Sequence, residues 1–290
     1  MNILVTGANG QLGSEIKSLV NDFSDLKFFF KGSSDLDICN FLQLEKFVVE
    51  NKIKVIINCA AYTAVDKAEG ENVIAQKVNE EGVLNLVKVS KTVNAKLIHI
   101  STDYVFNGEA FIPYKETDDV SPIGVYGKTK RLGELAVLNS EIDGIVIRTS
   151  WLYSPYGNNF VKTMLRLGED RDELGVIFDQ VGTPTYARDL ALTCLTVLSK
   201  SKGQKISGKG KLYHFSNEGV ASWYDFAKAI MVMANVNCNV KPIETKDYPT
   251  PAKRPHFSVL NKTKIKTDFE IEIPYWKDSL GECIFKLKKK

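Results

Sequence analysis

Short apolar runs rich in β-branched residues alternate with longer segments of helical periodicity along the first two thirds of the chain. The strand-like runs lie at 2–6, 27–30, 55–59, 96–101, 144–150 and 175–179, and the helical patterns occupy 11–20, 40–51, 71–93, 125–139 and 187–199. Asn40, three residues before Gln43, indicates a cap for the second helix. Continuous apolar strands that alternate with helices are typical of a parallel sheet covered on both faces. The sequence therefore predicts an α/β fold with a doubly wound, Rossmann-like parallel sheet.

The pattern becomes less regular after about residue 200. A polar Gly/Lys/Ser segment at 199–211 precedes a strand-like "LYHF", a helix that Ser222 opens, and a proline-rich stretch. We interpret this part as a smaller substrate lobe. The expected domains are a Rossmann-like unit at 1–150, with the strand and helix near 175–199 added to it, and a lobe formed mainly by 151–290.

Composition and charge restrict the class of protein. The 290 residues are 44% hydrophobic and 25% charged, with a net charge of +3, which is ordinary for a globular enzyme-sized chain. The small basic excess owes much to the final "KLKKK", and no basic stripe interleaved with aromatic residues predicts nucleic-acid binding. No apolar run approaches a membrane span, and the N-terminus lacks a signal-peptide pattern. We expect a cytoplasmic protein.

Cysteine and histidine positions indicate neither a disulfide framework nor a metal site. The five cysteines are scattered and never form C-x-x-C, so we expect reduced, mostly buried thiols. The three histidines lie far apart, and His99 falls within an apolar strand-like run that is typical of a core histidine. No metal ligand is assigned to these residues.

The first strand leads directly into "TGANGQLGSEI", which places Gly7, Gly10 and Gly13 at three-residue intervals before a helix. Small residues in such a turn let a pyrophosphate approach backbone N–H groups at the helix N-terminus. A simple strand-to-helix turn needs only one glycine. The pattern therefore predicts a dinucleotide site, with the spacing G-x-x-G-x-x-G in place of the more familiar G-x-G-x-x-G.

Tyr126 and Lys130 stand four residues apart within a predicted helix, so both side chains lie on one face. Such a pair could transfer a proton, with the ammonium beside the phenol. It could equally be a partly exposed aromatic ring beside a solvated charge. The spacing alone leaves both interpretations open.

The glycine spacing combined with Tyr-x-x-x-Lys resembles the extended short-chain dehydrogenase/reductases. Six further stretches, in this order, are similar to the dTDP-4-dehydrorhamnose reductase family: "NCAAYTAVDKAE", "VNEEGVLNL", "STDYVFNG", "YGKTKRLGE", "IRTSWLYSPYGNNF" and "DQVGTPTYARDLA". The resemblance covers nearly the whole chain. It implies an oxidoreductase that reduces the 4-keto group of dTDP-4-dehydro-L-rhamnose to dTDP-L-rhamnose with NAD(P)H.

The resemblance implies three catalytic residues. Tyr126 would be the general acid that protonates the carbonyl oxygen, and Lys130 would lower the pKa of the Tyr126 phenol toward neutrality. Lys130 would also hydrogen-bond the nicotinamide ribose. Thr102, at the end of the fourth strand, would bond the same carbonyl oxygen.

Related families offer other functions. The nucleotide-sugar 4,6-dehydratases carry Asp-Glu after the threonine, whereas here Tyr104 follows Asp103, so the acid/base group for elimination is missing. Epimerases usually end the same stretch in Val-Tyr-Gly, which differs from Val105 to Gly108 here. A reductase fits best, although a reductase or epimerase of another nucleotide sugar stays open. So does a non-catalytic, NADP-binding partner protein similar to the regulatory subunit of methionine adenosyltransferase.

The same resemblance implies substrate contacts. Trp151, after the fifth strand, would stack on the deoxyhexose, and simple core packing is the alternative. Arg254 would pair with the nucleotide diphosphate, and an exposed arginine without a ligand is the alternative. The remaining residues implied to line the sugar pocket are Thr63, Val65, Thr102, Asp103 and Tyr104.

For the cofactor, Asp37 and Ile38 match a family pair beside the adenine, although Asp37 could also cap the following helix. The end of the second strand holds Lys31 and no acidic residue, so we expect NADPH to bind and NADH to be accepted. Asn79 matches an asparagine near the catalytic tyrosine, with a helix-surface residue as the alternative. The other expected cofactor contacts are Gly7, Asn9, Gly10, Gln11, Leu12, Gly13, Asn58, Ala60, Ala61, Tyr126 and Lys130.

Some members of this family form a homodimer around a magnesium ion held by glutamates. Glu15 matches one of these ligands, whereas "TYARDLA" puts Arg188 near the position of another. The resemblance thus implies a homodimer and makes Glu15 a candidate Mg²⁺ ligand at its interface. Whether the ion is used stays open.

Overall fold

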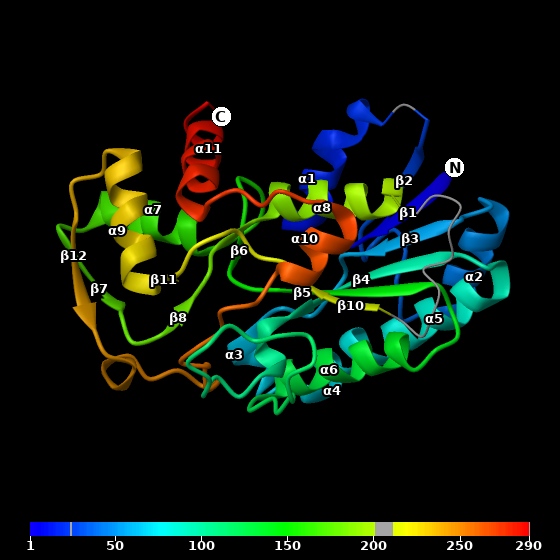
Figure 1. Cartoon of the computed structure of the whole chain (residues 1–290), viewed down its shortest axis with the longest axis horizontal. Helices are drawn as coiled ribbons and strands as arrows, with labels where there is room; N and C mark the ends of the chain where they lie inside the picture. Colours follow the sequence, from blue (N-terminus) through cyan, green and yellow to red (C-terminus); the bar gives the residue numbers. More distant parts are fainter. Residues whose placement is uncertain (24, 201–210, 290) are drawn as a thin grey trace.

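The centre of the molecule is a parallel sheet in the order β2-β1-β3-β4-β5-β10 (Figure 1). The computed structural model describes residues 1–23, 25–200 and 211–289. The strands of this sheet are β1 (Asn2–Thr6), β2 (Lys27–Lys31), β3 (Val55–Asn58), β4 (Lys96–Thr102), β5 (Gly144–Thr149) and β10 (Lys211–His214). All neighbouring strands pair in parallel. The predicted doubly wound α/β fold is confirmed.

The order of the strands determines where a ligand can enter. From β1 the chain moves outward to β2 and then crosses to β3 on the other side, so the connections leave β1 and β3 toward opposite faces. A crevice forms at such a switch point, outside the carboxyl ends of the strands. The glycine-rich turn follows β1 at this point.

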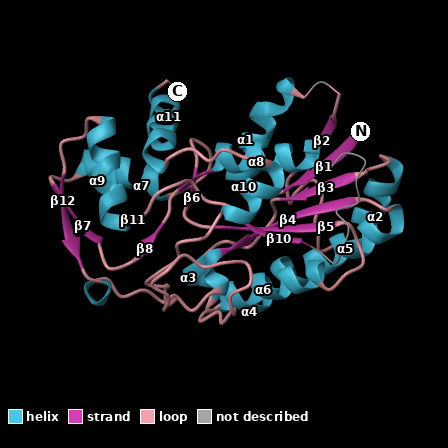
Figure 2. Ribbon diagram, viewed as in Figure 1, coloured by secondary structure: helices cyan, strands magenta, loops and turns pink. Residues whose placement is uncertain are grey.

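Helices cover both faces of the sheet (Figure 2). On one face α1 (Gln11–Leu19), α8 (Ala187–Lys200) and α10 (Thr263–Phe269) pack through a core cluster that includes Ile16, Leu195 and Ile265. On the other face α2 (Phe41–Glu50), α5 (Gly82–Val93) and α6 (Val125–Leu138) pack through a second cluster. None of the helices in the described parts of the chain combines the length and apolar character needed to cross a bilayer.

Local capping agrees with the sequence in the second helix. The side chain of Asn40 accepts a hydrogen bond of 3.2 Å from the backbone N–H of Gln43, which confirms the predicted cap of α2. The carboxylate of Asp37 accepts the N–H of Cys39 in the preceding turn. Asp37 is therefore not the cap of this helix.

The helical segment expected at 71–93 is interrupted. It consists of α4 (Asn72–Gln76), one π-helical turn η2 (Lys77–Glu81) and α5. Such π-turns are frequent at functional sites because they redirect a side chain. The remaining short helical segments are η1 (Val20–Asp22), α3 (Val65–Ala68), η3 (Asp103–Val105) and η4 (Thr245–Asp247).

A smaller lobe lies beyond the carboxyl ends of the central strands (Figure 1). Its helices α7 (Phe160–Asp170), α9 (Trp223–Ala234) and α11 (Trp276–Lys288) share a hydrophobic core of their own. Ser222 and Asp225 form a capping box that opens α9, as the sequence predicted for Ser222. Three two-stranded sheets complete the lobe: β6 (Leu152–Tyr153) with β9 (Thr185–Tyr186), β7 (Glu173–Ile177) with β12 (Asn239–Ile243), and β8 (Val181–Gly182) with β11 (Ala221–Ser222).

One strand assignment was wrong. The run expected at 175–179 was added to the nucleotide-binding unit, but the strand there is β7, which pairs with β12 outside the central sheet. The edge position next to β5 belongs to β10, within the strand-like "LYHF". Most of the polar segment expected at 199–211 lies outside the described residues.

Candidate active site

A glycine-rich turn joins β1 to α1, and two close backbone contacts shape it. Gly7 has a φ of +61°, and a Cβ atom there would lie 2.5 Å from the backbone nitrogen of Ala60. At Gly13, a Cβ atom would lie 2.6 Å from the Cα atom of Ala8. Side chains are excluded at both positions, so the packing of the turn itself requires these two glycines.

The first turn of α1 leaves its backbone N–H groups available to a ligand. Gly10 precedes the helix in an extended conformation, and no side chain of the described residues caps the helix there. A helix N-terminus of this kind attracts anions through its N–H groups and its dipole. The turn therefore fits a pyrophosphate group.

A cleft of about 1460 Å³ separates the carboxyl edge of the sheet from the C-terminal lobe. It brings together most of the residues that the sequence predicted for catalysis, cofactor and substrate. These are Gly7, Asn9, Gly10, Gln11, Leu12, Asp37, Ile38, Ala60, Ala61, Thr63, Val65, Thr102, Asp103, Tyr104, Tyr126, Lys130, Trp151 and Arg254. Five predicted residues do not line the cleft: Gly13, Glu15, Lys31, Asn58 and Asn79.

The end of β2 presents Gly32 and Ser33 to the cleft. The ammonium of Lys31 instead lies 5.0 Å from the centre of the Phe47 ring. Asp35, which sequence reasoning missed, accepts the N–H of Gly32 at 3.0 Å and lies outside the cleft lining. The carboxylate of Asp35 is thus used to shape the turn after β2.

Asn58 and Asn79 act behind the cleft. Asn58 is buried, accepts a hydrogen bond from the Thr6 hydroxyl at 2.6 Å and bonds His99 at 2.9 Å. Asn79 is also buried, so the alternative of a helix-surface residue is wrong. Its amide holds the backbone of Tyr62 through two hydrogen bonds, at 2.9 and 3.1 Å, and donates to Thr129 at 3.1 Å. Asn79 therefore ties the loop after β3 to α6.

Tyr126, Lys130 and Thr102 meet at the carboxyl end of β4. Tyr126 and Lys130 project from one face of α6, one helical turn apart, and both line the cleft. The Lys130 ammonium donates a hydrogen bond of 2.7 Å to the backbone oxygen of Ile100. The Thr102 side chain hydrogen-bonds the Tyr126 phenol. The structure thus brings Thr102 beside this pair, where the resemblance had led us to expect it.

The expected lowering of the Tyr126 pKa was wrong for this structure. Burial raises the pKa of Tyr126 to about 12, against a smaller lowering by the Thr102 hydrogen bond. Burial also lowers the pKa of Lys130 to about 8, although the Glu134 carboxylate opposes that shift. The phenol is consequently a proton donor at neutral pH, and the lysine titrates just above neutrality.

Asp103 and Tyr104 form the wall next to this trio. The Tyr104 ring packs edge-on against Tyr126, with ring centres 5.4 Å apart. Asp103 is buried, accepts a hydrogen bond of 3.0 Å from Thr102, and its pKa is raised by burial to about 6. A carboxyl group of this kind changes charge in mildly acidic solution.

Trp151 lines the cleft in a strained backbone conformation. Its φ of +48° lies in the left-handed region, which costs a non-glycine residue about 1–3 kcal/mol. Its indole stacks on Trp223, with ring centres 3.6 Å apart and planes inclined by 8°. Both rings remain partly exposed and line the cleft, so core packing alone does not account for Trp151.

Arg254 is paired in this structure. Its guanidinium contacts both carboxylate oxygens of Asp66, at 3.1 and 2.7 Å, and donates to the backbone oxygen of Ala252 at 3.2 Å. These contacts hold the segment after η4 against α3. The Arg254 side chain is partly buried and lines the cleft beside Tyr248 and Thr250, so the alternative of a solvent-exposed arginine is wrong.

The surroundings of Glu15 do not fit a magnesium ion. Glu15 is buried, and its carboxylate accepts a hydrogen bond of 2.7 Å from Ser154. Arg188 pairs with Glu282 at 3.5 Å, and Lys286 pairs with Glu282 at 2.8 Å, so two cations lie where a hard cation would need oxygen ligands. No group of three or more ligating side chains gathers among the described residues.

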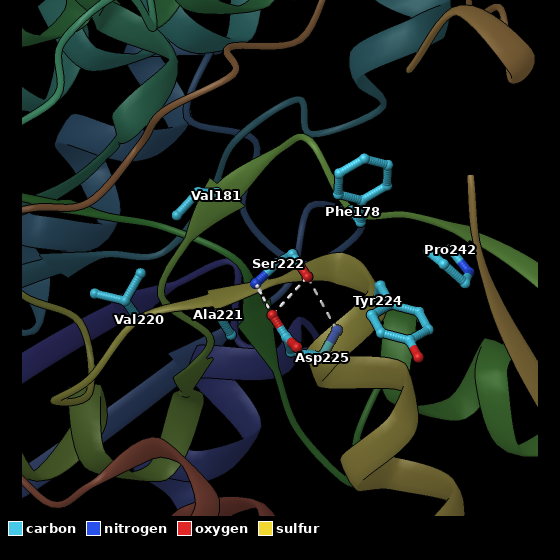
Figure 3. Close-up of a pocket in the computed structure, with 8 residues that line it drawn as sticks. All are labelled: Phe178, Val181, Val220, Ala221, Ser222, Tyr224, Asp225 and Pro242. Atoms are coloured by element: carbon cyan, nitrogen blue, oxygen red, sulfur yellow. Dashed lines mark hydrogen bonds between the residues drawn. The ribbon is translucent and has the colours of Figure 1, made fainter. Parts of the chain in front are cut away.

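A second, shallower cavity of about 400 Å³ lies in the C-terminal lobe, between β8, β11 and β12 (Figure 3). Ser222 and Asp225 meet there through the capping box of α9, and Tyr224 stands beside them. The residues predicted for catalysis, cofactor and substrate do not line this cavity.

Sequence reasoning missed several cleft residues and their partners. Trp223 and Phe160 each occupy the first position of a helix, after the caps Ser222 and Asn159. Those caps could have indicated where the two helices begin, but not that Trp223 and Phe160 line the cleft. Glu134 stands four residues after Lys130, so the same helical spacing could have found it.

The fold and the site together define the class of protein. A parallel sheet, this glycine-rich turn, a Tyr-x-x-x-Lys pair and a threonine at the carboxyl edge of the sheet are the features of nicotinamide-dependent short-chain dehydrogenase/reductases. Residues 1–289 match the family model described as the RmlD substrate binding domain. The chain belongs to this family, whose members include the dTDP-4-dehydrorhamnose reductases.

Relatives and solved structures agree. The dTDP-4-dehydrorhamnose reductase of Aggregatibacter actinomycetemcomitans is 44% identical over 286 residues, covering 96% of each chain. A crystal structure of the same kind of enzyme from Clostridium acetobutylicum has a TM-score of 0.93 at 44% identity, over 99% of this chain and 100% of that one. One from Bacillus anthracis in complex with NADP has a TM-score of 0.91 at 38% identity, over 98% and 99% of the two chains.

Proposed function

We propose that this protein reduces the 4-keto group of dTDP-4-dehydro-L-rhamnose to an alcohol, giving dTDP-L-rhamnose. The observation that carries the proposal is the meeting of Thr102, Tyr126 and Lys130 in the same cleft as the glycine-rich turn. Membership of a family whose relatives carry this enzyme name supports the choice of substrate.

NADPH would supply the hydride to C4 of the sugar when bound. The glycine turn supports its pyrophosphate, because Gly7 and Gly10 leave the N-terminus of α1 accessible. Gly32 and Ser33 at the end of β2 would face the adenosine ribose, and a relative's complex with NADP favours the phosphorylated cofactor. We expect NADH to be used as well, since the cleft would hold either NADPH or NADH.

Tyr126 would deliver the proton to the carbonyl oxygen. Its raised pKa keeps the phenol protonated in the resting enzyme. As the oxygen of the substrate gains charge, Thr102 would hydrogen-bond it and the Lys130 ammonium would stabilise the phenolate that forms. Tyr104 stands where a dehydratase would need an acid, so the chemistry ends at the alcohol.

The substrate would lie across the cleft. Thr63, Val65, Asp103 and Trp151 would surround the sugar, and Arg254 would exchange Asp66 for the diphosphate. We propose that the unit at 1–150, together with α8, binds the cofactor. The region 151–290 would mainly hold the nucleotide sugar, apart from α8, β10 and α10, which complete the central layers.

The test is to mix purified protein with dTDP-4-dehydro-L-rhamnose, made in place by the upstream enzymes, and follow the loss of reduced-nicotinamide absorbance with NADPH and with NADH. Tyr126→Phe and Lys130→Met should abolish the reaction while NADPH still binds Tyr126→Phe. Tyr224→Phe, in the second cavity, is the matched control and should react normally. Tight NADPH binding without consumption by the unmodified protein would contradict the reductase and favour a partner protein.

A further inference from the structure

Three aromatic side chains from distant parts of the chain form one surface in the cleft. We call Trp151, Trp223 and Phe160 the aromatic platform. Trp151 and Trp223 are nearly parallel at 3.6 Å, and Phe160 is inclined against Trp223 with ring centres 4.6 Å apart. All three are partly exposed and line the cleft, so the uncovered part of the platform faces the open cleft.

The position of Trp151 is fixed by its backbone and by one glycine. Trp151 has a left-handed φ of +48°, a conformation that is unfavourable for a residue with a Cβ atom. The Trp151 carbonyl accepts a hydrogen bond of 3.1 Å from the backbone N–H of Thr185. A Cβ atom at Gly182 would lie 2.7 Å from the Trp151 indole. Backbone strain of this kind requires support from the surroundings, which the stacked Trp223 ring supplies on one face.

The other two rings stand on capped helix starts. Trp223 is the first residue of α9, where the Ser222 side chain accepts the N–H of Asp225 at 3.1 Å. Phe160 is the first residue of α7, where Asn159 accepts the N–H of Lys162 at 3.1 Å. Because both helix starts are locked, the rings are placed before any ligand arrives.

The platform adjoins the reacting groups. Thr149 pairs with Thr102 across β4 and β5, and Trp151 follows Thr149 by two residues. Two residues of extended chain span roughly 7 Å. A sugar whose carbonyl meets Thr102 and Tyr126 therefore has another side of its ring within reach of the indoles.

We propose that Trp223 is a specificity-determining residue, which holds Trp151 and completes a flat apolar wall for the deoxygenated side of a 6-deoxyhexose. The inference rests on the proposed function. A methyl group and ring C–H bonds pack well on indole faces, whereas a 6-hydroxyl group would be desolvated there without a partner. The wall thus selects 6-deoxy sugars over 6-hydroxy sugars attached to the same nucleotide.

The experiment compares binding of dTDP-L-rhamnose, dTDP-glucose and dTDP by titration calorimetry in the presence of NADPH. Trp223→Leu should weaken dTDP-L-rhamnose about tenfold and leave dTDP unchanged, because only the sugar contacts the wall. Trp223→Phe leaves a smaller aromatic face and should lose part of the dTDP-L-rhamnose affinity, but less than Trp223→Leu. Tyr224→Leu, the neighbouring residue outside the cleft, is the control and should alter neither ligand.

One optical measurement and one ratio of affinities keep the test independent of the folding of Trp223→Leu. Parallel indoles at this distance couple their transitions, so a far-ultraviolet circular dichroism couplet should be present and should vanish in Trp223→Phe, which keeps its melting temperature. If Trp223→Leu does not fold, the ratio of dTDP-L-rhamnose to dTDP-glucose affinity in Trp223→Phe decides the matter: it should fall if the wall selects 6-deoxy sugars.

Equal losses of affinity for dTDP-L-rhamnose and dTDP in Trp223→Leu would show that the aromatic platform contacts the nucleotide. That result would overturn this inference but not the proposed function. Unchanged affinity for both in a folded Trp223→Leu would also overturn it, as would an unchanged ratio in Trp223→Phe. Unmodified protein that binds NADPH and dTDP but shows no added affinity for dTDP-L-rhamnose would overturn the proposed function together with it.

Discussion

The Glu134 carboxylate binds the Arg148 guanidinium at two points, with N–O distances of 2.7 and 2.9 Å, and both side chains are buried. Glu134 stands one helical turn after Lys130, as Lys130 stands one turn after Tyr126. Its negative charge counteracts the lowering of the Lys130 pKa by burial. A buried ion pair below the cleft therefore helps to keep the catalytic candidate Lys130 charged.

Glu134→Gln should shift the alkaline limb of the pH profile toward lower pH. The charged form of Lys130 is the active one, and its pKa of about 8 already lies near neutrality. Without the carboxylate the pKa should fall by roughly one unit, so activity is lost at lower pH than in the unmodified enzyme. The measurement is kcat/KM for the keto sugar across neutral and alkaline pH.

The single substitution leaves Arg148 buried without its partner, which costs about 3–5 kcal/mol of stability. Glu134→Gln combined with Arg148→Gln removes both charges and should restore folding while keeping the shifted profile. Arg131→Gln, which removes only the more exposed partner of Glu134, is the control. An unchanged alkaline limb in the folded double variant would contradict the role given to Glu134.

Asp103→Asn should stabilise the protein near neutral pH and have little effect in acid. Burial raises the pKa of Asp103 from 3.8 to about 6, so the folded state binds more protons than the unfolded state between these values. Stability therefore falls as pH rises through this window, by about 2–3 kcal/mol in total. Melting temperatures at several pH values should show a gain for the variant that grows from about pH 4 and reaches its full size above about pH 6. The exposed Asp119→Asn is the control, and an equal gain at all pH values would contradict the assignment.

Local patterns were sufficient for the central layers and for the shared helix face of Tyr126 and Lys130. The alternation of apolar runs and helices gives β1 to β5 within a residue or two. Of these strands, β1, β3, β4 and β5 are buried along most of their length, whereas β2 at the edge of the sheet is partly exposed. Tyr126 and Lys130 lie on one face because helical periodicity requires it. The sequence also singled out Gly7, where a positive φ and the contact with Ala60 exclude a side chain.

Long-range relationships were beyond those patterns. The runs of β7 and β10 are both short and apolar, and nothing within them specifies the partner strand. Burial decides the pKa of Tyr126, and burial depends on the loop carrying Tyr104 and not on the neighbouring lysine alone. The pairing of Asp66 with Arg254 joins residues 188 positions apart, so no sequence spacing could indicate it.

Asp66→Asn should strengthen the binding of dTDP, and Arg254→Gln should weaken it. In the structure Asp66 holds the guanidinium of Arg254, which is partly exposed, so a bound diphosphate would compete with Asp66 for it. A partly exposed ion pair is worth less than about 1 kcal/mol, so the gain should be about threefold. Titration of dTDP in the presence of NADPH measures it, with Lys253→Gln as the control. Unchanged affinity in Arg254→Gln would contradict contact with the diphosphate.

Removal of divalent metal should change neither activity nor stability. A bridging ion would need carboxylates that already have partners. Glu15 accepts a hydrogen bond from Ser154, and Glu282 forms ion pairs with Arg188 and Lys286. We therefore expect equal rates and melting temperatures with a chelator and with added Mg²⁺.

Arg188→Glu supplies the sharper comparison, because it replaces a cation of this cluster by a third carboxylate near Glu15 and Glu282. The pKa of the buried Glu15 is already raised by desolvation, and the Arg188 charge lowers it in part. Loss of that charge should destabilise the folded variant, and added Mg²⁺ should restore its melting temperature. Arg166→Glu, a change of the same charge elsewhere on the surface, should show no response to Mg²⁺. A chelator that lowers the melting temperature of the unmodified protein would contradict this account and return Glu15 to the role of a metal ligand.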